Sequence, residues 1–219
     1  MTFRRQRHYG SVLLILLILI TTAACSGKYW RTVTKTPEAF VTAASDPAYR
    51  GPSFKKLVVF QLTEYGPYRA AIENAFTERF LNAGVRMVAG GLCLTAGESL
   101  KDKAAVINAL QKGAFDGVLT VAVLNTDGKD NKRIASWGKS EDTDRIDLYS
   151  RLAAADPAGR DLTDRVRLEI TLWEAETARK AWSGLTRSID KFDIEVEAYP
   201  LAEATAAALR EARLLRRLD

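Results

Sequence analysis

Residues 118–124 read Val-Leu-Thr-Val-Ala-Val-Leu, and this stretch decides the class of fold. It contains no charge and a single hydroxyl, and it is rich in β-branched side chains. Such a run is typical of a strand that is covered on both faces of a sheet. Asp116-Gly117 precedes it as a turn. Because helices must then lie on both sides of the strand, the stretch predicts an α/β fold.

The segments that precede this strand support the same class. Residues 57–62 form a second apolar run, and Pro67 then suits the first turn of a helix that extends to Ala83. Residues 85–88 predict a further strand, and residues 99–112 a further helix that ends at Gly113. The order strand, helix, strand, helix, strand indicates an α/β unit with helical crossovers.

The segments that follow predict a hairpin and a last helix. Residues 165–173 alternate between apolar and polar side chains, residues 174–178 form a turn, and residues 179–189 run back as the second strand. The pattern predicts an antiparallel hairpin with one face in water. Residues 201–215 are spaced as an amphipathic helix. We therefore expect a mixed sheet in two or three layers, in which the α/β unit is followed by an antiparallel hairpin and a C-terminal helix.

Residues 126–164 interrupt this pattern with a long polar segment. It is dense in charged and small residues, with one helical patch near residues 146–155. A connection of this length inside a compact domain is typically functional or mobile. Trp137 stands within it, next to Ser136, Gly138 and Lys139, with no evident core around it. We interpret Trp137 as a contact for a partner protein.

The N-terminus has the three parts of a secretory signal peptide. Its first ten residues carry three arginines and no acid, residues 11–20 are almost entirely apolar, and small residues lead to Cys25. The apolar run is about half the length of a spanning helix. The segment resembles the lipobox of bacterial lipoproteins, although Thr22 stands where leucine is commonest. The resemblance implies that residues 1–24 are removed and that Cys25 is lipidated, with acyl chains such as palmitate.

This resemblance also implies how the chain is organised and where it resides. We expect a lipidated tether over residues 25–54 and a single periplasmic α/β domain over residues 55–219. The residue directly after the cysteine is Ser26 and not an aspartate, which resembles the signal for sorting to the outer membrane. The expected location is therefore the outer membrane, with the domain anchored by lipid and facing the periplasm.

A second resemblance is carried by the domain itself. The strand at residues 56–60, the segment Gly113–Leu119, and the hairpin sequence Leu172–Trp182 are similar to a broad group of envelope lipoproteins. This group includes the penicillin-binding-protein activator lipoproteins and the curli-secretion lipoprotein. Glu174 stands where the group usually has aspartate, and Ala178 where it usually has glycine. The resemblance implies an envelope protein that acts by binding other proteins, and it transfers no catalytic residue.

Composition argues against most catalytic chemistry. The only histidine, His8, lies in the predicted signal peptide, so the mature chain would lack a Ser-His-Asp triad, a Cys-His pair and any histidine-containing zinc site. Once Cys25 is acylated, Cys93 is the only free thiol, and its apolar neighbours suggest a buried small hydrophobe. We therefore expect no enzyme activity, no cofactor and no metal.

Other binding motifs fail on their spacing. The glycines within residues 91–99 stand too far apart for a phosphate loop, and Glu98 occupies the position of the required lysine. Asp142 and Asp144 lack the glycine of a calcium loop. Removal of the leader leaves 29 basic residues of the original 32 against 27 acidic ones, so nucleic-acid binding is not expected.

The sequence thus predicts a lipid-anchored periplasmic adaptor or accessory protein that binds an envelope protein partner. The alternative is an accessory module that binds or transports a small ligand or a lipid, which requires an apolar cavity. Self-association of the chain is left open by the sequence.

Overall fold

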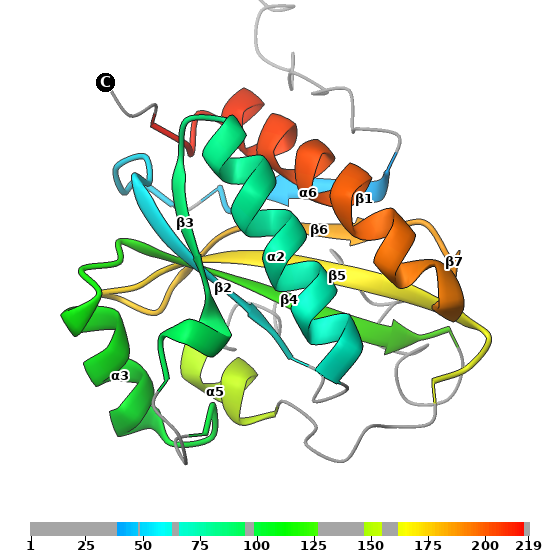
Figure 1. The fold of residues 1–219 in the computed structure, drawn as a ribbon. Coiled ribbons are helices and arrows are strands. Elements are labelled where there is room, and N and C mark those ends of the chain that lie inside the picture. Colours follow the sequence, from blue (N-terminus) through cyan, green and yellow to red (C-terminus); the bar gives the residue numbers. More distant parts are fainter. Residues whose placement is uncertain are drawn as a thin grey trace, which may run out of the picture. The chain divides into compact units, whose positions relative to one another are not determined.

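The strand predicted at residues 118–124 lies in the middle of the sheet. In the computed structural model it is β4 (Gly117–Asn125), and it pairs with β2 (Lys56–Gln61) on one side and β5 (Arg165–Glu174) on the other (Figure 1). Val118, Leu119 and Val121 have no solvent exposure. Alternate residues of the strand face opposite helical layers, which is why the whole run is apolar.

The structure describes residues 39–47, 49–62, 66–94, 99–126, 147–154 and 162–216. The other strands are β1 (Phe40–Ser45), β3 (Arg86–Ala89), β6 (Lys180–Thr186) and β7 (Ile189–Asp190). The α-helices are α2 (Gly66–Asn82), α3 (Lys103–Lys112), α5 (Leu148–Ala153) and α6 (Ile194–Glu211). Two short 3-10 turns are η1 (Gly90–Leu92) and η3 (Lys191–Asp193).

Within these residues, seven strands form one mixed sheet. The strand order is β1-β6-β5-β4-β2-β3, and β7 pairs with the start of β5. β2 is parallel to β3 and β4, whereas β4, β5, β6 and β1 pair successively in antiparallel fashion. The parallel part follows from the helical crossovers and the antiparallel part from the hairpin, so the predicted fold class is confirmed.

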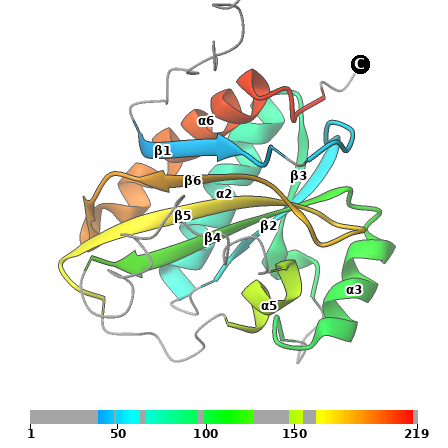
Figure 2. The same cartoon turned by 180° about the vertical axis from the view of Figure 1, so that it is seen from behind.

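Helices cover both faces of the sheet. α2 and α6 lie side by side over one face, and α3 and α5 lie on the other (Figures 1 and 2). The first layer buries Ile72 and Phe76 of α2 against Leu201 and Leu209 of α6 and the strands beneath. In the second layer the helices contribute buried side chains to a smaller cluster: Val106, Leu110, Leu148 and Leu152.

The sheet begins earlier in the chain than the predicted boundary at residue 55. Residues 40–45, placed by the sequence in the tether, form β1 and pair with β6 from Phe40↔Thr186 to Ser45↔Trp182. The Phe40 ring packs edge-on against Trp182, with centroids 5.7 Å apart. Phe40, Val41 and Thr42 are residue types that favour strands, but the segment is short, and it is a strand because it pairs with the edge of β6.

The hairpin face that the sequence placed in water is instead covered. Glu169 and Thr171 are only 5% and 4% exposed. The covering element is α5, whose Arg151 guanidinium lies 2.7 Å from the Glu169 carboxylate. The polar residues on this face therefore lie in a packed interface with α5. Alternation along the strand shows that they share one face, but it does not show whether that face is buried or exposed.

The last helix starts seven residues, about two turns, before the predicted Leu201. α6 begins at Ile194 and continues through Pro200, which stands on its exposed side. Proline removes one helical hydrogen bond, but burial of Ile194, Ala198 and Leu201 holds the helix on the sheet. No helix in the described part of the chain combines the length and apolar character that crossing a membrane requires.

Candidate protein-interaction surface

Both site residues predicted from the sequence lie outside the described residues. These are Cys25, the predicted lipidation site, and Trp137, the predicted partner contact. For the segment at residues 126–164 the structure describes its two ends and its helical patch, which is α5. The geometry of a binding surface is therefore built from those ends and from what lies beside them.

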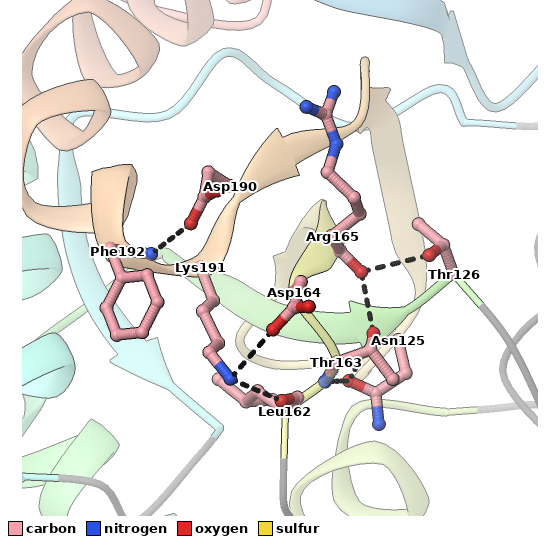
Figure 3. Close-up of polar contacts among 9 residues, drawn as sticks. All are labelled: Asn125, Thr126, Leu162, Thr163, Asp164, Arg165, Asp190, Lys191 and Phe192. Atoms are coloured by element: carbon pink, nitrogen blue, oxygen red, sulfur yellow. Dashed lines mark hydrogen bonds and ion pairs between the residues drawn. The ribbon is translucent and has the colours of Figure 1, made fainter.

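Hydrogen bonds join the two ends of this segment. The Asn125 side-chain carbonyl, at the end of β4, accepts a hydrogen bond from the Thr163 backbone N–H at 3.1 Å and lies 3.4 Å from the Thr163 hydroxyl. The Thr126 hydroxyl donates to the Arg165 carbonyl at 3.0 Å, and the Thr163 hydroxyl donates to the same oxygen at 2.7 Å (Figure 3). We call these four residues the loop-base clasp. It holds the start and the end of the long segment side by side.

Lys191 connects the clasp to the beginning of η3. Its ammonium donates to the Leu162 carbonyl at 3.1 Å and lies 3.3 Å from the Asp164 carboxylate, and its backbone N–H donates to the Asp164 carbonyl at 3.0 Å (Figure 3). Because the Asp164 side chain is 89% exposed, the ion pair contributes little stability by itself. Its effect is geometric, since it aligns η3 with the returning end of the segment.

An exposed apolar stripe begins directly after Lys191. Phe192 is 73% exposed, Val196 74% and Tyr199 37%, and their spacing of four and three residues places them along one side of η3 and α6. Asp190 caps the turn by accepting the Phe192 backbone N–H at 2.9 Å. The Lys191 ammonium lies 5.1 Å from the centre of the Phe192 ring. The α6 stripe (Phe192, Val196, Tyr199) is therefore continuous with the loop-base clasp.

Tyr199 is held in place by α2. Its hydroxyl donates to the Glu78 carboxylate at 3.1 Å, and the Arg79 guanidinium lies 5.2 Å from its ring centre. The hydrogen bond to Glu78, with the negative charge of that group, raises the pKa of Tyr199 above its usual value. The phenol is thus neutral at physiological pH and presents an oriented, amphipathic side chain at the end of the stripe.

Acidic side chains surround the stripe. Asp193, Glu195 and Glu203 are exposed. Glu195 stands one helical turn before Tyr199 and Glu203 one turn after it, while Asp193 precedes Val196 by three residues. We call these three residues the acidic rim.

α5 fastens the middle of the long segment to the sheet. The Asp147 carboxylate caps the helix by accepting the Ser150 N–H at 2.7 Å, and the Leu148 N–H donates to the Ala178 carbonyl at 3.1 Å. Ala178 has a φ of 58°, the left-handed conformation that glycine adopts most easily. The hairpin turn therefore keeps the backbone shape that glycine usually supplies at this position.

Cys93 has the features of a packed thiol. It is partly buried against the α3 side of the sheet, and its Sγ lies 3.6 Å from the Ala89 carbonyl. Burial, with a smaller effect from Glu73, raises the pKa of the Cys93 thiol to about 11. A thiol with so high a pKa is a weak nucleophile at neutral pH. The sequence-based interpretation as a small hydrophobe agrees with this position.

A buried carboxylate holds the loop after β3. Glu73 of α2 is 3% exposed, and it accepts hydrogen bonds from the Gly91 N–H at 2.9 Å and the Gln61 N–H at 3.3 Å, with the Arg69 guanidinium at 3.1 Å. Both carboxylate oxygens of Glu73 accept hydrogen bonds from these partners, so its role is structural. Among the described residues, no cluster of acidic, histidine or cysteine side chains is arranged to hold a metal ion.

Sequence reasoning missed the α6 stripe. Its signal was present: Phe192, Val196 and Tyr199 have helical spacing on a different side from the buried Ile194 and Ala198. A helix that is apolar on two sides suggests a second contact. The pattern was missed because the expected helix covered residues 201–215, whereas η3 and α6 begin at Lys191 and Ile194.

The chain matches no family model and no curated protein. Among solved structures it is similar to the PelC dodecamer from Paraburkholderia phytofirmans, with 16% identity and a TM-score of 0.41, over 80% of this chain and 97% of that chain. A point variant of the same protein gives 15% identity and a TM-score of 0.40, over 77% and 98% of the two chains. At these values the function and assembly of those proteins do not transfer to this chain.

Proposed function

We propose that this chain is a lipid-anchored accessory protein of the bacterial cell envelope, on the periplasmic face of the outer membrane, and that it acts by binding another protein. The anchor is Cys25, preceded by a basic segment, an apolar run and small residues. About 14 residues separate it from β1, which allows the domain to stand at most about 50 Å from the lipid. This is half the reach that a tether extending to residue 54 would have.

The observation that carries the binding function is the α6 stripe next to the loop-base clasp. Phe192 and Val196 each expose nearly three quarters of their surface, side by side on one helical face. Clustered exposed apolar side chains typically mark a contact with another molecule. The clasp brings the ends of the segment that contains Trp137 to the same place, so a partner could contact both.

The anchor is tested by metabolic labelling with an alkyne fatty acid in cells that produce the full chain. We expect the label on the wild-type chain in the outer-membrane fraction. A Cys25→Ser variant should carry no label and should move to the soluble periplasmic fraction. Labelling that persists in Cys25→Ser would contradict the assignment of the lipidation site.

Partner binding is tested by photo-crosslinking in the same cells. A photoreactive amino acid at position 137 or 192 should trap one discrete partner, identified by mass spectrometry. The matched control is position 111, where Gln111 is exposed on α3 on the opposite face of the sheet. The proposal fails if positions 137 and 192 give no adduct, or the same adducts as position 111.

A further inference from the structure

The α6 stripe carries more information than exposure alone, because its surroundings restrict what can bind. The apolar part is narrow: Phe192, Val196 and Tyr199 follow one line along η3 and α6. A line of side chains at four- and three-residue spacing matches the apolar side of another helix better than a flat surface. The shape therefore favours a helical occupant.

The charge around the stripe is unbalanced. The acidic rim contributes three exposed carboxylates, and Glu78 adds a fourth at Tyr199. The nearby cations are already engaged: Lys191 with Asp164 and the Leu162 carbonyl, Arg187 with Glu197 at 3.8 Å, and Arg79 over the Tyr199 ring. An incoming helix would therefore meet mostly negative charge along the edges of its apolar contact.

We infer that the α6 stripe binds an amphipathic helix of the partner protein that carries lysine or arginine along both edges of its apolar face. Leucine-sized side chains would pack on Phe192 and Val196, and the basic edges would face the acidic rim. The inference rests on the proposed function, since it names the chemistry of the partner that the adaptor would hold.

The same charges argue against two other occupants. A second copy of this chain docking through an isologous contact would place the two acidic rims against each other, which is unfavourable. A bilayer rich in anionic lipid would likewise repel the rim, because juxtamembrane binding depends on clustered basic residues. A basic helix is the occupant for which both the shape and the charge are favourable.

The test uses the mature chain, residues 25–219 with Cys25→Ser, which carries neither leader nor lipid and needs no detergent, and two synthetic 18-residue helices. Both peptides have the same leucine face, and their edges are lysine in one and glutamate in the other. By isothermal titration calorimetry we expect the lysine peptide to bind at least about tenfold more tightly, with the preference falling as salt is raised. Equal binding of the two peptides would overturn the inference.

Substitutions locate the binding to the stripe. Phe192→Ser and Val196→Ser should each weaken binding of the lysine peptide by about fivefold or more, and Glu195→Lys should reduce the preference between the peptides. The matched control is Leu92→Ser, at an apolar residue 82% exposed on η1, which should leave affinity unchanged. All four positions are exposed, so circular dichroism should show unchanged folding. Affinity that survives Phe192→Ser and Val196→Ser would contradict the assignment.

Two controls separate the alternatives. If the chain self-associates in sedimentation equilibrium and Phe192→Ser abolishes this, the stripe binds a second copy of the chain. If the chain binds phosphatidylglycerol vesicles and Phe192→Ser abolishes this, the stripe binds lipid. Either result would overturn the inference. Crosslinks from position 192 in cells, together with no peptide preference, would leave the proposed function standing and refute only the basic helix. Absence of crosslinks would refute the proposed function whatever the peptides do.

Discussion

The two faces of the sheet are stabilised in different ways. Under α2 and α6 the interface is predominantly apolar, with Leu57, Leu119 and Ile170 fully buried beneath the helices. Under α3 and α5 polar groups are buried among apolar ones: the Trp173 indole N–H donates to the Thr120 hydroxyl at 2.9 Å, and Arg151 pairs with Glu169. Burial of apolar area is non-directional, whereas hydrogen bonds and ion pairs require one geometry.

This difference indicates a division of roles. The α2/α6 face buries the larger apolar cluster, and the α3/α5 face determines where a short helix from the long segment attaches. α5 has only six residues, too few to be stable alone, so its position depends on Leu148, Leu152 and the Arg151–Glu169 contact. The stripe proposed to bind a partner lies on the exposed side of the layer with the larger apolar cluster.

The largest effect is expected from a cavity in the apolar face. Phe76 has no exposure, and its ring stacks on Phe80 with centroids 6.0 Å apart. Phe76→Ala should lower the free energy of unfolding by about 3–5 kcal/mol, measured by urea denaturation. Leu81→Ala on the same helix, where the side chain is 60% exposed, is the matched control and should change it by about 0.5 kcal/mol or less. Similar values for the two variants would contradict the assignment of α2 to the core.

A smaller loss is expected when the polar contact on the other face is broken. Glu169→Leu removes the carboxylate 2.7 Å from Arg151, a guanidinium whose side chain is 10% exposed, and should cost about 3 kcal/mol. The double variant Arg151→Met/Glu169→Leu should recover most of this loss, because a buried apolar pair avoids the desolvation of both charges. If the double variant is no more stable than Glu169→Leu, the ion pair is not what makes the single substitution costly.

The smallest effect is expected at the cap of α5. Asp147→Ala removes the acceptor of the Ser150 N–H and should cost about 1 kcal/mol at pH 7. That hydrogen bond lowers the pKa of Asp147 below its usual 3.8. The stabilisation is therefore present above pH 3.8 and is lost as the pH falls through the lowered pKa of the folded state. Unfolding curves of wild type and variant should converge once the pH lies below the lowered pKa of Asp147, and a difference that persists there would exclude the charged cap as its source.

Much of the fold could be predicted because the relevant signals are local. The apolar run of β4, the alternation in β5 and the glycine after α3 each depend on neighbours within one element. α3 starts at Lys103, four residues after the predicted start at residue 99, because the Asp102 carboxylate accepts the Ala104 and Ala105 N–H groups and caps the helix there.

The candidate surface could be predicted only in part. The long segment at residues 126–164 was identified as a place for binding, but nothing in its sequence shows that Asn125 and Thr163 join its ends. The α6 stripe was missed because exposure of Phe192 and Val196 depends on which side of α6 lies against the sheet. The packing of α6 against α2 and the sheet as a whole determines which side of α6 is exposed.

The sequence by itself determined the α/β class, the hairpin and the terminal helix, since hydrophobic periodicity and turn residues act over a few residues. It also predicts the anchor at Cys25 from contiguous residues. Only the tertiary structure decided that residues 40–45 complete the sheet, that Glu169 is buried, and that Phe192 is exposed beside the loop-base clasp. These features depend on pairing and burial between residues far apart in the chain, which periodicity within one element does not determine.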